Sequence, residues 1–257
     1  MQIEAEVPIL VKDLHKAFGD QKVLNGINLR VDRGETVAVL GRSGTGKSVL
    51  LKLIIGLQPP DSGSVRIAGQ EITGLDVNQV NEVRKKVGFL FQQAALYDSL
   101  SVEDNVAFPL TRHTKMSGDE RKERARELLA SVGMDQDLEK MPSEISGGMQ
   151  KRVGLARALA LDPEILLFDE PTAGLDPITA TEIGNLIMDL KSKRKMTAIV
   201  VTHDLRSAKV FSDRLVLIHE GNIVAEGTFA DLQKSRDEFV AQFLADGSAE
   251  PVSKSQG

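Results

Sequence analysis

The chain has 257 residues, which is long enough for one large domain or two small ones with a sizeable buried core. Lys and Arg number 32 against 37 Asp and Glu, so the formal charge is -5, a balance that does not favour general nucleic-acid binding. The sequence contains no cysteine, which excludes disulfides and thiolate metal sites. No stretch approaches the roughly 20 apolar residues that cross a bilayer, so a membrane role would need another chain to supply the span.

Short β-rich runs alternate with helical patterns in the first part of the chain, which favours an α/β fold with a largely parallel central sheet. Strands are expected at four early segments, in chain order Ile9–Leu14, Ile27–Val31, Thr36–Leu40 and Ser64–Ile72. A helix is expected over Lys47–Leu57, directly after the third of these strands. The same alternation returns after residue 160, with strands expected at Ile165–Phe168, Thr197–Val201 and Arg214–His219 and a helix at Thr179–Lys191.

Between these two parts the pattern is helical. The segment Gly118–Val132 is charged and has one apolar stripe, and a second helix is expected after Ser146. We therefore expect a helical subdomain at about residues 94–160, inserted into a domain that spans residues 8–246. Residues 247–257 are rich in small and polar residues with little to bury, which predicts a flexible C-terminal tail.

A phosphate-binding motif of the form G-x-x-x-x-G-K-[ST] occupies eight consecutive residues, Gly41, Arg42, Ser43, Gly44, Thr45, Gly46, Lys47 and Ser48. It follows an apolar strand and opens a helix, so its glycine-rich backbone and the helix N-terminus can turn N–H groups toward phosphate oxygens. We expect Lys47 to reach the β- and γ-phosphates of ATP and Ser48 to ligate Mg²⁺. A glycine-rich turn without a ligand is the alternative, and the combination of motif and context disfavours it.

Two adjacent acids, Asp169 and Glu170, end the apolar run that begins at Ile165. Because neighbouring residues of a regular strand point to opposite faces, the two carboxylates are expected to play different parts. Phosphoryl transfer needs one acid beside the metal and another group beside the attacking nucleophile. Together with the upstream phosphate loop, this predicts Asp169 as a metal ligand and Glu170 as the general base. Two acids in the first turn of a helix are the alternative explanation.

Further segments resemble the motifs of ABC-family ATPases, in the same order along the chain. Ser146, Gly147 and Gly148 are similar to the centre of the family's LSGGQ signature. A serine N-cap followed by glycines is the simpler interpretation of these residues alone. The signature departs from the family at Met149, which stands where the family usually has glutamine and cannot supply the hydrogen bonds of an amide.

Other positions carry the same resemblance. Gln92 resembles the family's Q-loop glutamine, which senses Mg²⁺ and the attacking water. His203 resembles the switch histidine that contacts the γ-phosphate, and Ala173–Asp176 resembles the loop that lines the dimer interface. Phe18 stands where the family has an aromatic residue that stacks on adenine, although a lone phenylalanine more often belongs to a core.

The resemblance covers residues 9–227 and implies a P-loop NTPase (RecA-like) α/β core with an antiparallel β subdomain and an inserted helical subdomain. It implies an ATPase that binds ATP and Mg²⁺ and works as a homodimer with a second ATPase subunit. In such a dimer each ATP lies between the phosphate loop of one subunit and the signature of the other. Ser146, Gly147 and Gly148 would therefore act in the partner's site.

The resemblance also implies transmembrane permease subunits as partners. It places the chain as a peripheral protein on the cytoplasmic face of the inner (plasma) membrane, and the charge balance predicts no nucleic-acid partner. By position, Ala94–Glu103 should line the groove that receives a helix of the permease, because this segment is too apolar for a solvated loop.

Finer features resemble the ATPases of MCE-domain (mammalian cell entry) lipid transporters, including the maintenance-of-lipid-asymmetry type. They lie in three segments, Phe91–Tyr97, Asp104–Leu110 and Met141–Met149. This implies phospholipid or another lipid as cargo and an MCE-domain lipid-binding protein as a partner. The ATPase of a small-solute importer is the main alternative. Two others are a soluble ABC ATPase that acts on nucleic acid or the ribosome, and a module that holds ATP without hydrolysing it.

Overall fold

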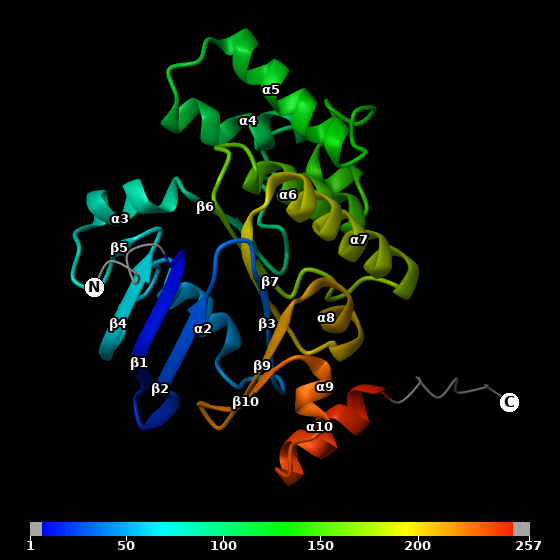
Figure 1. Ribbon diagram of the computed structural model, residues 1–257. Helices are drawn as coiled ribbons and strands as arrows, with labels where there is room; N and C mark the ends of the chain where they lie inside the picture. Colours follow the sequence, from blue (N-terminus) through cyan, green and yellow to red (C-terminus); the bar gives the residue numbers. More distant parts are fainter. Residues whose placement is uncertain (1–6, 249–257) are drawn as a thin grey trace, which may run out of the picture.

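The computed structural model describes residues 7–248, which form two β-sheets, flanking helices and a helical lobe (Figure 1). The larger sheet has six strands in the order β10-β9-β3-β8-β7-β6. Its strands are β3 (Thr36–Leu40), β6 (Val87–Leu90), β7 (Ile165–Asp169), β8 (Thr197–Thr202), β9 (Arg214–His219) and β10 (Asn222–Gly227). All neighbours in this sheet are parallel except β10, which pairs antiparallel with β9. Every residue of β3, β7 and β8 is buried, as expected for parallel strands covered on both faces.

The smaller sheet is antiparallel, with the order β2-β1-β4-β5. Its strands are β1 (Ile9–Phe18), β2 (Gln21–Val31), β4 (Ser62–Ile67) and β5 (Gln70–Glu71). The prediction of a single strand over Ser64–Ile72 is therefore wrong at its centre. Ala68 and Gly69 have φ angles of 48° and 78°, and this left-handed pair turns the chain so that β5 pairs with β4.

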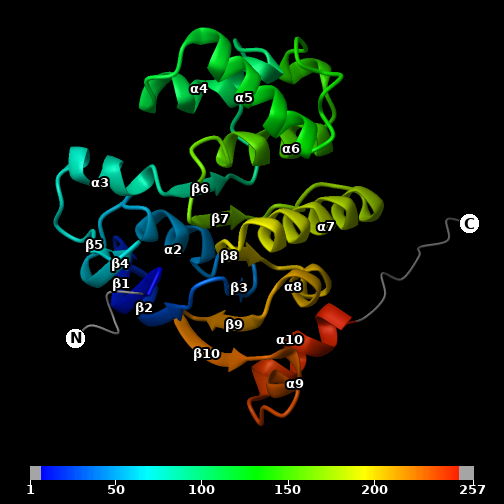
Figure 2. The same cartoon turned by 45° about the horizontal axis from the view of Figure 1, so that its top comes forward.

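Helix α2 (Lys47–Ile54) lies between the two sheets (Figure 2). Its buried Leu and Ile side chains share one apolar cluster with residues of both sheets. Burying each such side chain contributes roughly 1.5–3 kcal/mol before the loss of conformational entropy is counted. The helix ends earlier than the predicted Leu57 because Gly56, with a φ angle of 65°, has the left-handed conformation that terminates helices.

The opposite face of the larger sheet is covered by α7 (Pro177–Arg194) and α8 (Leu205–Phe211). Alternation along the strands explains this arrangement, because Ile165 and Leu167 of β7 join the α2 cluster whereas Leu166 and Phe168 join the α7 cluster. Three further helices lie at the edges, α3 (Val77–Arg84), α9 (Phe229–Leu232) and α10 (Glu238–Ser248). The first two residues of the predicted tail end α10, and residues 249–257 lie outside the described part of the chain.

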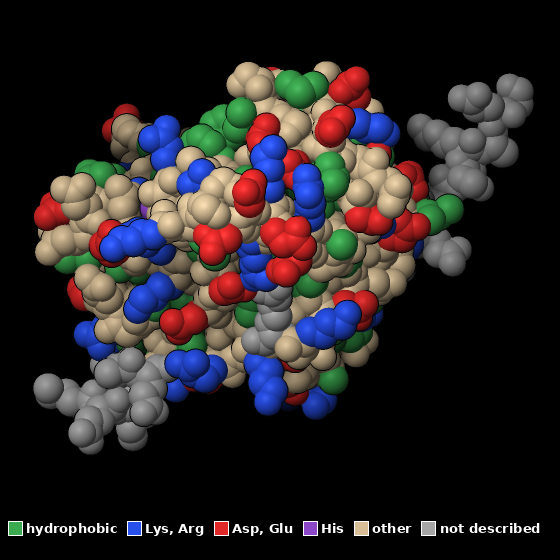
Figure 3. All heavy atoms as spheres, turned by 90° about the horizontal axis from the view of Figure 1, so that it is seen from above, with side chains coloured by type: hydrophobic (Ala, Val, Ile, Leu, Met, Phe, Trp, Pro, Cys, Tyr) green, Lys and Arg blue, Asp and Glu red, His purple; other side chains and the backbone are tan. Residues whose placement is uncertain are grey.

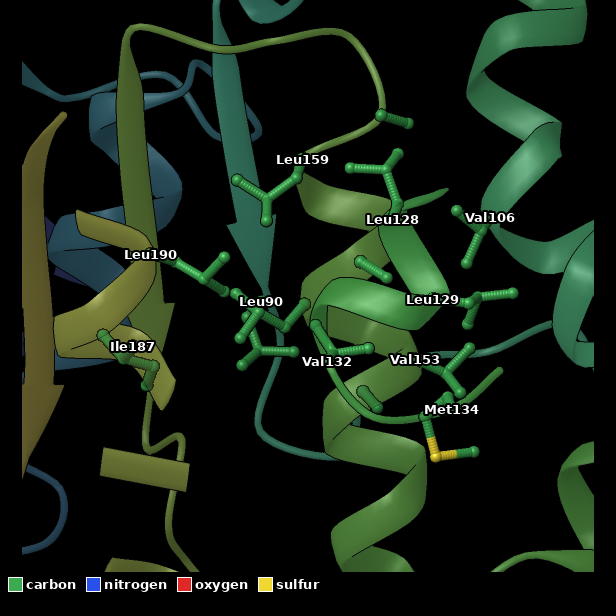
Figure 4. Close-up of a cluster of buried hydrophobic side chains, with 14 of the residues drawn as sticks. Leu90, Val106, Leu128, Leu129, Val132, Met134, Val153, Leu159, Ile187 and Leu190 are labelled. Atoms are coloured by element: carbon green, nitrogen blue, oxygen red, sulfur yellow. The ribbon is translucent and has the colours of Figure 1, made fainter. Parts of the chain in front are cut away.

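The helical lobe stands between β6 and β7 in the sequence and at the top of Figure 1. It consists of α4 (Val102–His113), α5 (Gly118–Ser131), a 3-10 turn (Pro142–Glu144) and α6 (Gly147–Ala158). Figure 4 shows part of one apolar cluster, which extends from Leu128, Leu129 and Val153 of the lobe past Leu90 of β6 to Ile187 of α7. Helix α6 therefore connects the lobe to the sheet through one continuous apolar cluster.

The surface of the described residues gives two further findings. No helix within residues 7–248 is long and apolar enough to cross a membrane. Seen from the side of the lobe, acidic and basic side chains are intermixed, with no continuous basic area on that face (Figure 3).

Candidate active site

The phosphate loop connects the carboxyl end of β3 to the first turn of α2. Gly46 immediately precedes the helix and has a φ angle of 91°, a conformation that residues with a side chain rarely adopt. A Cβ atom at this position would also lie 2.7 Å from Val23 Cγ1. The loop therefore ends on the first N–H groups of α2, which lack partners within the helix and can donate to an anion.

The ammonium group of Lys47 lies inside this loop. Its Nζ donates to Gly41 O at 2.9 Å and to Arg42 O at 3.0 Å, and the residue is only 6% exposed. Burial lowers the pKa of Lys47, and the negative charges of Glu170 and Asp169 partly oppose this effect. A buried cation is thus enclosed by the loop, at the place where the negative charge of a phosphate would compensate it.

Ser48 and Asp169 meet at the edge of the sheet. Ser48 Oγ, in the first turn of α2, donates to Asp169 Oδ1 at 2.7 Å. Among residues 7–248 no group of three or more His, Cys, Asp or Glu side chains could hold a metal ion. Mg²⁺ in nucleotide sites usually takes one or two protein oxygens together with phosphate oxygens and waters, so a hydroxyl and a carboxylate at this position fit that ion.

Glu170 follows the last residue of β7 and does not continue the strand. Its φ angle is 48°, in the left-handed region, and its N–H donates to Val201 O at 2.9 Å. The expectation that Asp169 and Glu170 point to opposite faces requires a regular strand, and this condition is not met at Glu170. A left-handed turn, which the sequence pattern does not encode, separates the two carboxylates.

The carboxylate of Glu170 contacts the imidazole of His203, which follows the end of β8. Both Glu170 oxygens lie 3.0 Å from His203 Nδ1. Glu170 is buried, whereas the imidazole of His203 is more than half exposed. The pair therefore joins a sheltered carboxylate to a ring that can meet a ligand from solvent.

Gln92 follows β6, whose neighbour in the sheet is β7. Its side chain is exposed, and its backbone carbonyl accepts a hydrogen bond from Lys151 Nζ of α6. Lys151 also donates to Glu170 O at 3.3 Å. No sequence pattern predicts Lys151 as part of the site, because it lies outside the apolar stripe of its helix, and only the folded chain brings it to these two carbonyls.

The signature segment forms the start of α6. Ser146 is the N-cap, and its Oγ accepts a hydrogen bond from Met149 N at 3.3 Å. Ser146 and Gly147 are exposed, whereas Gly148 is buried, and a Cβ atom at Gly148 would lie 2.5 Å from Thr179 Cγ2 of α7. The serine therefore caps its own helix, and the exposed first turn leaves N–H groups available to another molecule.

Phe18 ends β1 and is 47% exposed, so it does not belong to a core. Lys16 Nζ lies 5.5 Å from the centre of its ring. The last residues of β1 are fixed by Asp61, which accepts hydrogen bonds from Lys16 Nζ at 2.8 Å and from Ala17 N at 2.6 Å. These contacts hold the phenyl ring at the surface, where a planar ligand can stack on it.

Three hollows lie near these residues. One of about 350 Å³ borders the phosphate loop at Arg42–Thr45, and one of about 580 Å³ lies between α7 and α8 beside His203. A third, of about 380 Å³, has an aromatic wall that includes Phe89, Tyr97 and Phe108. Of the segment Ala94–Glu103 that the sequence assigned to a permease groove, Ala95 and Tyr97 line this third hollow.

Comparisons with known proteins agree with this architecture. Residues 24–173 match the family described as ABC transporter. The probable ribonucleotide transport ATP-binding protein mkl of Mycobacterium tuberculosis is 41% identical over 250 residues, 97% of this chain and 70% of that protein. The intermembrane phospholipid transport system ATP-binding protein MlaF of Haemophilus influenzae is 41% identical over 244 residues, 95% of this chain and 92% of that protein.

Solved structures give the same result. The dimeric post-hydrolysis state of an ATP-binding cassette bound to ADP and Pi has a TM-score of 0.80 and 36% identity, covering 86% of this chain and 98% of that chain. The phosphate loop and the parallel sheet define a P-loop ATPase. The chain belongs to the ABC transporter family, as an ATP-binding, ATP-hydrolysing subunit. The predicted resemblance to ABC ATPases, including the MlaF type, and the predicted fold class are thereby confirmed.

Proposed function

We propose that this subunit binds ATP with Mg²⁺ and hydrolyses the ATP at the carboxyl ends of β3, β7 and β8. Lys47 and the amides of Gly44–Ser48 hold the phosphates, while Ser48 and Asp169 hold the metal ion together with Gln92. When bound, Mg²⁺ supplies positive charge that offsets the charge developing on the phosphate oxygens. The observation that carries this proposal is the hydrogen bond of 2.7 Å between Ser48 and Asp169, which joins the phosphate loop to the strand-end acid.

Glu170 is proposed as the general base that orients water and accepts its proton during attack on the γ-phosphate. Its burial and its contact with His203 fix the carboxylate in one place. His203 then contacts the γ-phosphate with its exposed ring edge, and the side chain of Gln92 closes the site from the side of β6. Phe18 stacks on the adenine ring.

Two copies of the chain are needed for a complete site in this proposal. The exposed first turn of α6, with Ser146 and Gly147, would donate to the γ-phosphate bound by the partner subunit. Met149 in place of the family's glutamine does not change the backbone groups proposed to meet the phosphate. Its own N–H donates to Ser146 Oγ within the same helix. The dimeric state of the similar solved cassette supports the arrangement.

The membrane partner in this proposal is a permease whose cytoplasmic helix enters the aromatic hollow beside the Q-loop, by which we mean the segment Phe91–Tyr97 that contains Gln92. Tyr97 and Phe108 form one wall, with ring centres 4.6 Å apart, and Arg157 Nη1 and Nη2 fix the Q-loop by donating to Ala95 O and Ala94 O. A helix with an apolar face suits this lining. The chain would then be a peripheral protein on the cytoplasmic face of the inner membrane.

We further propose that the transporter moves phospholipid or another lipid, with an MCE-domain protein as partner. The similarity to MlaF, whose name describes intermembrane phospholipid transport, supports this cargo, and the match covers 92% of that protein. A small-solute importer is the second candidate, because mkl, which is equally similar, is named for ribonucleotide transport. Action on nucleic acid has the least support, given the formal charge of -5.

The cargo is tested by affinity purification of this subunit from native membranes in mild detergent, followed by identification of the co-purifying proteins and lipids. A permease with an MCE-domain protein and bound phospholipid is the expected result. A permease with a solute-binding protein would contradict lipid transport and leave the ATPase assignment intact. The same purification is made with Tyr97→Ala, which should lose the permease. Leu57→Ala is the matched control, because it removes an exposed apolar side chain elsewhere and should keep the permease.

A further inference from the structure

Lys151 is a charged side chain in an interior position. It lies in the second turn of α6 and is only 4% exposed. Burial lowers its pKa, and the charges of Asp169 and Glu170 oppose this effect. A buried ammonium group is costly unless it is hydrogen-bonded, so its partners define what it does.

Its partners are two backbone carbonyls from two different catalytic segments. Lys151 Nζ donates to Gln92 O, just after β6, and to Glu170 O at 3.3 Å, just after β7. No side chain of α6 other than Lys151 reaches both segments through the hydrogen bonds of residues 7–248. One ammonium group thus joins the helical lobe, the Q-loop and the residue proposed as the base.

The backbone of Glu170 is the part of this arrangement that needs support. Its φ angle of 48° is uncommon for a residue with a side chain and persists only where the surrounding structure enforces it. The N–H of Glu170 is held by Val201 O, and its carbonyl accepts from Lys151 Nζ and from Ala173 N. Because this left-handed turn sets the direction of the side chain, fixing the carbonyl also fixes the carboxylate.

We propose that Lys151 is a positioning residue for hydrolysis, which holds the backbone of Glu170 and Gln92 in the geometry that the reaction needs. It does not touch the phosphate loop, whose own contacts are made by Lys47, Ser48 and Thr45. The binding of ATP therefore does not depend on it, whereas the chemical step does.

The place of Lys151 on α6 extends this role to the dimer. It lies five residues after Ser146, a rise of about 7.5 Å along one helix. The N-terminal turn of that helix is proposed to meet the ATP of the partner subunit. The first two turns of α6 therefore link two places. The N-terminal turn contacts the ATP bound by the partner subunit, and Lys151 holds Glu170, the base that acts on the ATP of its own subunit.

The test compares steady-state ATP hydrolysis and binding of a fluorescent ATP analogue in the full-length chain and its variants. Lys151→Met keeps the length of the side chain and removes the ammonium group. Lys151→Arg restores a cationic donor. Lys191→Met is the matched control, because Lys191 is also largely buried, at 14% exposure of its side chain, and pairs with Asp213 far from the site.

The expected result for Lys151→Met is a fall in kcat of at least about tenfold with KM for ATP and analogue affinity changed less than threefold. Lys151→Arg should recover part of kcat, and Lys191→Met should keep kcat within twofold. A normal kcat in Lys151→Met, or parallel losses of kcat and ATP affinity without rescue by arginine, would overturn the proposal. If Lys151→Met does not fold, Lys151→Leu, which also removes the donor, is judged by the same division between kcat and KM.

This inference rests on Glu170 as the base, so Glu170→Gln is measured in parallel. If Glu170→Gln still hydrolyses ATP at the normal rate, the assignment of the base is wrong. If Glu170→Gln is inactive while Lys151→Met retains full kcat, only the role given to Lys151 is wrong.

Discussion

The hydroxyl of Ser48 donates a hydrogen bond of 2.7 Å to Asp169 Oδ1, although the two residues are 121 positions apart in the chain. The bond connects the first turn of α2 to the carboxyl end of β7, so the fold itself sets the distance between the phosphate loop and the acid. Two hard oxygens at this spacing are suited to share one Mg²⁺ ion.

Replacing Ser48 by alanine should therefore raise the Mg²⁺ concentration needed for half-maximal ATP hydrolysis by at least about tenfold, because one of the three proposed protein ligands is lost. The measurement is a Mg²⁺ titration of hydrolysis at saturating ATP. Ser212→Ala is the control, since that hydroxyl donates to Ala208 O of α8 and has no other side-chain hydrogen bond within residues 7–248. An unchanged Mg²⁺ dependence in Ser48→Ala would remove this residue from the metal site.

Phe18→Ala should raise KM for ATP by about tenfold or more with little change in kcat. Stacking of a base on an aromatic ring contributes roughly 1–3 kcal/mol, and every 1.4 kcal/mol is a factor of ten in affinity. Phe18→Tyr keeps the ring and should behave like the wild type. Equal KM values for the alanine variant and the wild type would show that adenine lies elsewhere.

Asp61 gives a prediction about pH. The hydrogen bond from Lys16, and after it that from the Ala17 N–H, hold the pKa of this carboxyl below its usual value. The stability contributed by the ionised form is therefore fully present above the usual pKa of about 4 and is lost as pH falls through the lower pKa of the folded state. Asp61→Asn should lower the melting temperature at pH 7, with a difference that shrinks toward pH 3. A difference that stays constant over this range would contradict the ion pair.

Gly88→Ala should destabilise the chain. A Cβ atom on Gly88 of β6 would lie 2.4 Å from the backbone oxygen of Ala158, so α6 would have to move away from the sheet. Overpacking of this kind costs about 1–3 kcal/mol, which corresponds to a melting temperature lower by several degrees for a domain of this size. Gly118→Ala is the control, because nothing lies within 4 Å of a Cβ there and alanine suits a helix. An unchanged melting temperature in Gly88→Ala would contradict the prediction, because it would mean that α6 accommodates the added Cβ atom without loss of stability.

Those parts of the site that lie in one continuous segment could be predicted from the sequence. Gly41–Ser48 carries its own strand, glycines and helix start, so local pattern defines both the loop and its surroundings. The run that ends at Asp169 was equally clear, because a fully buried parallel strand is a short apolar run. The α/β core and the inserted helices could be predicted because the spacing of apolar residues changes from a mixed strand and helix pattern to a purely helical one between these two segments.

The rest depended on contacts between segments distant in the chain or on single backbone angles. The turn between β4 and β5 contains Ala68, which has a positive φ angle. No residue pattern predicts this conformation for an alanine. The same holds for Glu170, whose left-handed conformation is enforced by Val201, Ala173 and Lys151. Lys151 was not recognisable as part of the site because its partners are carbonyl groups, which every residue has.

The role of Glu170 as the base is tested by ATP hydrolysis of Glu170→Gln, measured together with the oligomeric state of this variant in MgATP. Glutamine keeps the size of the side chain and cannot accept the proton of the attacking water. Hydrolysis should fall by at least about a hundredfold while ATP binding is kept, and the variant should accumulate as a closed dimer with ATP trapped inside. Hydrolysis at the rate of the wild type, or a monomer in saturating MgATP, would contradict these expectations.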